Sequence, residues 1–198
     1  FPNWSHGTTG IAWMFAALYQ DTKKEEYLEL AEAGIEYAMN ISVGDETGRL
    51  IPYQDHPVTG PTWDKYYLST CHGPVGSTLA TRLLYEITGD EKYKKWTVEL
   101  SKGILKAGAP EKRSWGYWNC QCLCCGLAGI VEHFAHMYEF TGEAQFYDAM
   151  IRSADVLLSV SDHTMEGKRT WYDSWWRTIP TRVVSYPGLY VGSAGCAA

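Results

Sequence analysis

The sequence lacks several features that would assign it to a class directly. None of its apolar runs approaches the roughly 20 residues that cross a membrane as a helix, so no membrane span is predicted. No stripe of Lys or Arg stands out and the net charge is −6, which makes nucleic acid and anionic membranes poor partners. No basic, apolar leader is visible at the start. What is left is a globular chain, and 198 residues with 45% hydrophobic content are enough to build a core.

Cysteine, in contrast, is crowded. Four of the six cysteines fall between residues 120 and 125. Such crowding is typical of a reduced or metal-bound site rather than of a spread disulfide framework, so we expect a cytoplasmic setting. The six are Cys71, Cys120, Cys122, Cys124, Cys125 and Cys196.

A Gly-x-x-Gly element occurs four times and indicates that the chain is built of repeats. Each of the first three copies is followed by an apolar stretch, a turn that contains Thr, and a second stretch of helical periodicity. The stripes Leu28-Ala31-Ile35-Ala38 and Ile151-Ala154-Leu158 predict two of the buried helix faces. We expect helices near 11–19, 24–38, 77–87, 91–105, 127–140 and 143–158. The four elements begin at Gly7, Gly73, Gly126 and Gly192.

This pattern predicts an all-α fold, an α/α toroid of helical hairpins with one helix of each pair inside and the other outside. Three hairpins and the start of a fourth make about half of such a ring, so residues 1–198 are expected to be part of a longer chain. A shorter solenoid that never closes is the alternative. Glycine suits the tight entry into each inner helix because it allows positive φ and close backbone approach.

Residues just before each glycine should converge where the inner helices begin. The repeat register therefore brings Cys71 together with Cys124 and Cys125, although they are far apart in sequence. Three protein ligands with an open fourth position are typical of a catalytic zinc site. The positive ends of the inner helices also favour thiolate over thiol.

Four segments resemble, in order, the motifs of lanthionine synthetase C-like proteins. They are Ser-His-Gly-Thr-Thr-Gly (5–10), Cys-His-Gly-Pro-Val-Gly (71–76), Leu-Cys-Cys-Gly-Leu-Ala-Gly (123–129) and Gly-Leu-Tyr-Val-Gly-Ser-Ala-Gly (188–195). The resemblance implies an α/α toroid domain. Residues 1–198 resemble its C-terminal half. It also implies the zinc-dependent addition of a cysteine thiol to dehydroalanine or dehydrobutyrine, as in lantibiotic biosynthesis. The expected partners are a dehydrated precursor peptide or a glutathione-like thiol.

The resemblance also implies roles for single residues. Family members usually bind Zn²⁺ with one Cys of the second motif and a Cys-His pair of the third. The pair Cys124–Cys125 departs from this and resembles the subgroup that uses three cysteines. Three thiolates would give the site a net charge of about −1, so a further thiolate would be held less tightly and be a better nucleophile. His6 is at the position of the family's acid–base histidine, and His72 is the second candidate for protonating the enolate.

Other interpretations remain open from the sequence. The 9 Trp and 14 Tyr, with loop acids such as Asp55, Asp64 and Asp173, fit a six-hairpin carbohydrate hydrolase or lyase. A non-catalytic zinc protein that binds glutathione or a peptide is a third interpretation. Lys65 is the nearest basic residue upstream of the second motif and is given no role. Cys120 and Cys122 are alternate ligands, a redox pair or buried small residues, and Cys196 is expected in the core.

Overall fold

A computed structural model describes residues 1–55, 66–112, 120–164, 166–174 and 183–198. The chain divides into two compact units, Phe1–Lys106 (unit 1) and Ala107–Ala198 (unit 2). Within the described residues the long elements are all helices, as predicted, and the strands are two or three residues long. None of these helices has the length and apolar character needed to cross a membrane.

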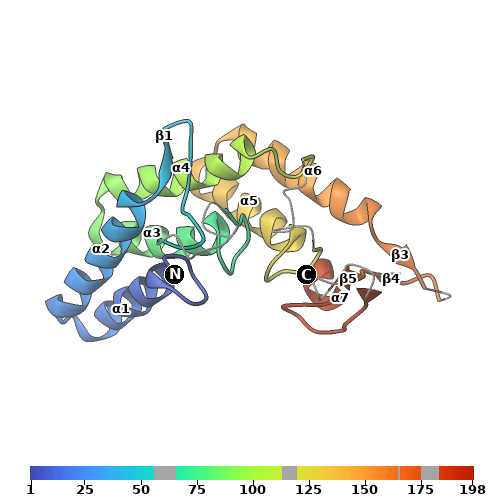
Figure 1. Ribbon diagram of the computed structural model, residues 1–198, viewed down its shortest axis with the longest axis horizontal. Helices are drawn as coiled ribbons and strands as arrows, with labels where there is room; N and C mark the ends of the chain where they lie inside the picture. The colour runs from blue at the N-terminus through green and yellow to red at the C-terminus, as the bar shows by residue number, and fades with distance from the viewer. Residues whose placement is uncertain (56–65, 113–119, 165, 175–182) are drawn as a thin grey trace. The chain divides into compact units, whose positions relative to one another are not determined.

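Unit 1 consists of two helical hairpins (Figure 1). The first helix of each hairpin packs against its partner, and the two first helices also pack against each other, so α1 contacts α3. The core is made mainly of small and branched residues, which lets the helices approach closely. The predicted stripe on the second helix is confirmed, because Ala31, Ile35 and Ala38 are buried and Leu28 packs at their edge. The helices are α1 (Thr8–Thr22), α2 (Glu25–Asn40), α3 (Pro74–Thr88) and α4 (Glu91–Lys106).

A short hairpin that the sequence pattern did not predict follows α2. Its strands β1 (Val43–Asp45) and β2 (Gly48–Leu50) are antiparallel, and β2 lies against α4. The Arg49 guanidinium donates to the nearly buried Glu99 carboxylate, with 3.0 Å between Nε and Oε2. This ion pair holds the hairpin on α4.

Unit 2 contains a third hairpin, formed by α5 (Leu127–Thr141) and α6 (Ala144–Ser159), and a short helix α7 (Ser193–Ala197). Its core includes Phe134 and Phe146, whose rings stack with 6.1 Å between centroids. The predicted stripe Ile151-Ala154-Leu158 is wrong, because Ile151 and Leu158 are more than 40% exposed. The buried face instead carries Phe146, Ala149, Ser153 and Leu157. The strand pairs are β3 (Asp162–His163) with β4 (Arg169–Thr170), and β5 (Asp173–Ser174) with β6 (Val183–Val184).

The predicted Thr turns are confirmed, and all three are built alike. The hydroxyl of the last helical residue, Thr22, Thr88 or Thr141, donates to the carbonyl four residues earlier at 2.7 Å. The next residue takes the left-handed conformation that ends a helix. Two of these cap residues are the glycines Gly89 and Gly142, and the first is Lys23.

The predicted starts of the first and third helices are wrong by about one turn, because each helix begins directly after the first glycine of its motif. The glycine backbone is extended, so positive φ is not the reason for glycine here. The reason is contact with the carbonyl six residues earlier. A Cβ would lie 2.1 Å from the Phe1 oxygen at Gly7, 2.5 Å from Tyr67 at Gly73, 2.0 Å from Cys120 at Gly126 and 2.2 Å from Tyr186 at Gly192.

This contact predicts a large difference between two glycines at opposite ends of α5. Gly126→Ala forces backbone atoms apart and should lower the free energy of unfolding by about 3 kcal/mol. Gly142→Ala adds a Cβ into open space at φ 70 and should cost about 1 kcal/mol. Denaturant unfolding followed by circular dichroism measures both, and equal losses would contradict the proposed reason for the motif glycine.

Candidate metal centre

The four motif loops follow the same path into their helices. In three of them the first helical N–H bonds the carbonyl six residues before the glycine, at 3.1 Å from Thr8 to Phe1, 3.0 Å from Leu127 to Cys120 and 2.7 Å from Ser193 to Tyr186. In the second motif that position is Pro74, which has no N–H. Each loop is thus folded back onto its helix, and the two residues before the glycine occupy matching places.

Motif loops also pair with each other within a unit through one recurring bond. In unit 1 the Ser5 N–H donates to the Cys71 carbonyl at 2.8 Å. In unit 2 the Cys124 N–H donates to the Tyr190 carbonyl, also at 2.8 Å. All four residues lie two positions before their glycine. Within each unit, equivalent positions of the two motifs are therefore joined by a backbone hydrogen bond.

Cys124 and Cys125 present two thiols from one loop of unit 2. Their sulfurs are 3.4 Å apart, and Cys125 donates to Cys124. This is well beyond the roughly 2.05 Å of a disulfide bond. Both side chains are only partly buried, so this pair is accessible to an ion.

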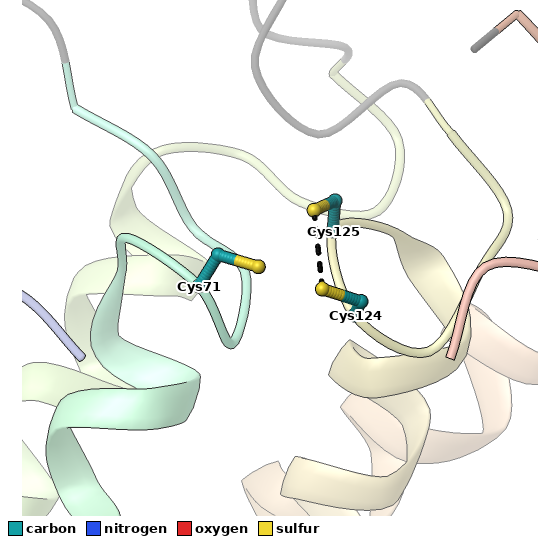
Figure 2. Close-up of side chains that lie close together, drawn as sticks. All are labelled: Cys71, Cys124 and Cys125. Carbon is teal, nitrogen blue, oxygen red and sulfur yellow. Dashed lines mark hydrogen bonds between the residues drawn. The ribbon is translucent and has the colours of Figure 1, made fainter. Parts of the chain in front are cut away.

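The sulfurs of Cys71, Cys124 and Cys125 all lie within 4.8 Å of one another (Figure 2). These are the three residues that the repeat register brings together. Sulfurs bound tetrahedrally at about 2.3 Å to one zinc lie roughly 3.8 Å apart, so the donor set fits this ion with small adjustments. Three soft thiol ligands also favour zinc over magnesium or calcium. The cluster can therefore bind a metal.

The two predicted acid–base candidates lie next to each other in unit 1. The rings of His6 and His72 are 5.3 Å apart between centroids. His6 is exposed, whereas His72 is partly buried. The structure thus brings these two histidines together and leaves His6 the more accessible of the pair.

A set of rings around His72 was not predicted. Tyr53 meets it edge-on at 4.9 Å, Tyr67 at 5.6 Å and Phe1 at 6.1 Å between centroids. Phe1 and Tyr67 both lie six residues before a motif glycine, and this shared offset is the signal in the sequence that could have identified them. The rings restrict how His72 can turn, which favours a fixed orientation.

The other three cysteines lie in, or contact, the segment that carries Cys124 and Cys125. The Cys120 thiol donates to the Cys125 carbonyl at 3.0 Å, and the Cys196 thiol to the Gln121 carbonyl at 3.2 Å. Cys122 is 4% exposed, as one of its three alternatives expected, whereas Cys196 is only partly buried, so the expectation that it lies in the core is wrong. Two thiols outside the three-sulfur group, those of Cys120 and Cys196, therefore donate hydrogen bonds to the backbone of the cysteine-rich segment.

Of the three acids named for the carbohydrate interpretation, the structure describes the side chain of Asp55. The Asp55 carboxylate accepts a 2.5 Å bond from the Tyr37 hydroxyl, which raises the Tyr37 pKa to about 12. Asp173 lies in β5, and Asp64 and Lys65 lie outside the described residues.

Comparison with solved structures identifies a protein of similar fold. One solved structure that resembles the chain is an inactive variant of the α-1,6-mannanase GH76A of Salegentibacter sp. HEL1_6 in complex with α-1,6-mannotriose, at 18% identity and a TM-score of 0.50. The match covers 80% of this chain and 48% of that one, so the chain spans about half the length of the mannanase. At this identity the likeness concerns the helical toroid fold alone. No curated protein sequence matches the chain.

The family model for "Lanthionine synthetase C-like protein" matches residues 3–198. This range includes all four Gly-x-x-Gly motifs and the three clustered cysteines. The chain belongs to the lanthionine synthetase C-like family.

Proposed function

We propose that the protein is a zinc-dependent thioether-forming enzyme that adds a cysteine thiol to dehydroalanine or dehydrobutyrine in a peptide. Cys71, Cys124 and Cys125 are the ligands, and the fourth position takes the thiol. The observation that carries the proposal is the group of three sulfurs, on matching loops of a lanthionine synthetase C-like chain.

The recurring backbone bond supports a shared site. It joins the first motif to the second, and the third to the fourth, always two residues before the glycine. Cys71 of the second motif and Cys124 of the third therefore occupy the same position in their loops. The chemistry that bound Zn²⁺ supplies is activation of a thiol as thiolate at neutral pH.

His6 is the proposed proton donor. When the sulfur–carbon bond forms at the β-carbon, the electron pair of the double bond moves to the α-carbon side, which must accept a proton. A donor has to reach that carbon, and exposed His6 is more accessible than the ring-enclosed His72. His72 and its rings then line the approach to Cys71, its neighbour in sequence.

The test is thiol addition to a peptide that contains dehydroalanine, followed by mass spectrometry. The chain loaded with zinc should form the thioether faster than the uncatalysed reaction, and removal of the metal by a chelator should abolish the difference. Zinc binding without any acceleration would favour the alternative of a zinc protein that binds glutathione or a peptide.

Cys125→His tests what the third thiolate contributes. The substitution removes one negative charge from the site, so the bound thiol should be held more tightly and react more slowly. We expect the rate of addition to fall about tenfold while zinc remains bound. An unchanged rate with full zinc occupancy would count against the role of the three-cysteine set.

A further inference from the structure

Cys120 holds the metal-binding loop of unit 2 with both its side chain and its backbone. Its thiol donates to the carbonyl of Cys125, with 3.0 Å between sulfur and oxygen. Its own carbonyl accepts the N–H of Leu127, the first residue of α5, at 3.0 Å. Residues 120–127 are therefore closed by two bonds that meet at Cys120, one of which ends on a residue of the sulfur cluster.

The repeat shows which of these bonds is special to this loop. The residue six before the motif glycine is aromatic in the other three motifs, where it is Phe1, Tyr67 or Tyr186. In all four motifs the glycine lies against the carbonyl of the residue at this position. The backbone contact is thus common to every repeat, whereas the thiol occurs only in the loop that carries two cysteines of the cluster.

We propose that Cys120 is a positioning residue that orients Cys125 for the metal; this inference rests on the proposed zinc site. A bond to the Cys125 carbonyl fixes the peptide plane between Cys125 and Gly126. Rotation of that plane is coupled to the direction of the Cys125 side chain. Held in this way, the Cys125 sulfur is oriented toward the ion before binding, so less ordering is required on binding.

A competing role for Cys120 is that of a fourth ligand, which would close the site in the manner of a structural Cys₄ zinc centre. The cluster of sulfurs within 4.8 Å of one another consists of Cys71, Cys124 and Cys125. The thiol of Cys120 meets a carbonyl oxygen instead. The geometry therefore favours positioning over ligation.

The first measurement is zinc affinity, by competition with a chromophoric chelator, on the full chain and its variants. Cys120→Ala should raise the zinc dissociation constant about tenfold, the usual scale for losing an outer partner of a ligand. Cys120→Ser should restore affinity to within about threefold, because a hydroxyl is also a donor. The matched control is Cys196→Ala, which removes a similar thiol bond that ends on Gln121 and should change affinity by less than about twofold.

The second measurement is the absorption spectrum of the Co²⁺-loaded chain, whose thiolate-to-metal bands grow with the number of bound thiolates. Native chain and Cys120→Ser should give the same band intensity. A lower intensity in Cys120→Ser would overturn the inference and identify Cys120 as a ligand. Equal zinc affinity in Cys120→Ala and native chain would also overturn it, while leaving the zinc site in place. A native chain that binds no zinc would instead overturn the proposed function itself.

Discussion

Replacing Cys71 with alanine should reduce the zinc content from about one ion per chain to nearly none after dialysis. Three thiolates share a binding free energy that, in small structural zinc sites, amounts to about 10–16 kcal/mol. Losing one of the three should cost at least about 4 kcal/mol, which raises the dissociation constant about a thousandfold. Metal analysis and chelator competition measure both quantities.

The control for this change is Cys122→Ala. Cys122 is buried in the same cysteine-rich segment as Cys124 and Cys125 but is not a member of the sulfur cluster. This variant should keep its zinc, so that the loss in Cys71→Ala reports ligation rather than the loss of any cysteine. If Cys71→Ala retains zinc with native affinity, the second motif does not contribute a ligand.

Substitution of His6 by alanine should lower the rate constant of thiol addition by about 10²–10⁴, the range for removing a general acid or base. Zinc affinity should stay at the native value, because His6 is not part of the sulfur cluster. The reason for the loss is that the electron-rich α-carbon then takes its proton from water instead of from a positioned imidazole. Single-turnover kinetics with a dehydroalanine peptide separate this step from binding.

His72→Gln is the matched variant for His6. Its ring lies 5.3 Å from the His6 ring and is partly enclosed by tyrosines, so we expect a smaller loss, of about tenfold or less. A result in the reverse order, with His72→Gln much slower than His6→Ala, would transfer the proton-donor role to His72.

The helical repeat could be predicted because its signals are local. Apolar periodicity, Thr turns and glycines act within a few residues, and the six long helices were found in the correct order. The helix starts at Thr8 and Pro74 were missed because the feature that requires the preceding glycine is a contact in the folded loop, which residue type alone does not reveal. It is the carbonyl of a residue six positions earlier, and only the folded loop places that oxygen against the glycine.

The buried face of α6 shows a second limit of the pattern. Apolar residues occur on two sides of this helix, and the sequence alone favoured Ile151 and Leu158. In the structure Ser153 occupies a buried position, while these two larger residues are exposed. The buried face carries Phe146, Ala149 and Leu157 with Ser153 among them, and a small polar residue of this kind can be buried where helices approach closely.

At the candidate site the register of the repeat predicted that Cys71, Cys124 and Cys125 come together, and their sulfurs lie within 4.8 Å of one another, while their role as metal ligands stays a prediction. The register could not identify the hydrogen bond from the Cys120 thiol to the Cys125 carbonyl, because such a bond leaves no periodic signal. The rings around His72 were also missed, although Phe1 and Tyr67 share one offset from their glycines, because their contact with His72 forms only in the fold. Comparing the four motifs position by position would have shown that Cys120 stands where the other three motifs have an aromatic residue, but not the hydrogen bond that its thiol makes.

Zinc X-ray absorption spectroscopy on the full chain tests the central claim most directly, because it counts the sulfurs bound to the ion. The account predicts three sulfur neighbours at about 2.3 Å, with a lighter atom in the remaining position when no thiol is added. A fourth sulfur should appear when a substrate thiol binds. A shell of two sulfurs, or of four before any thiol is added, would contradict the three-cysteine site.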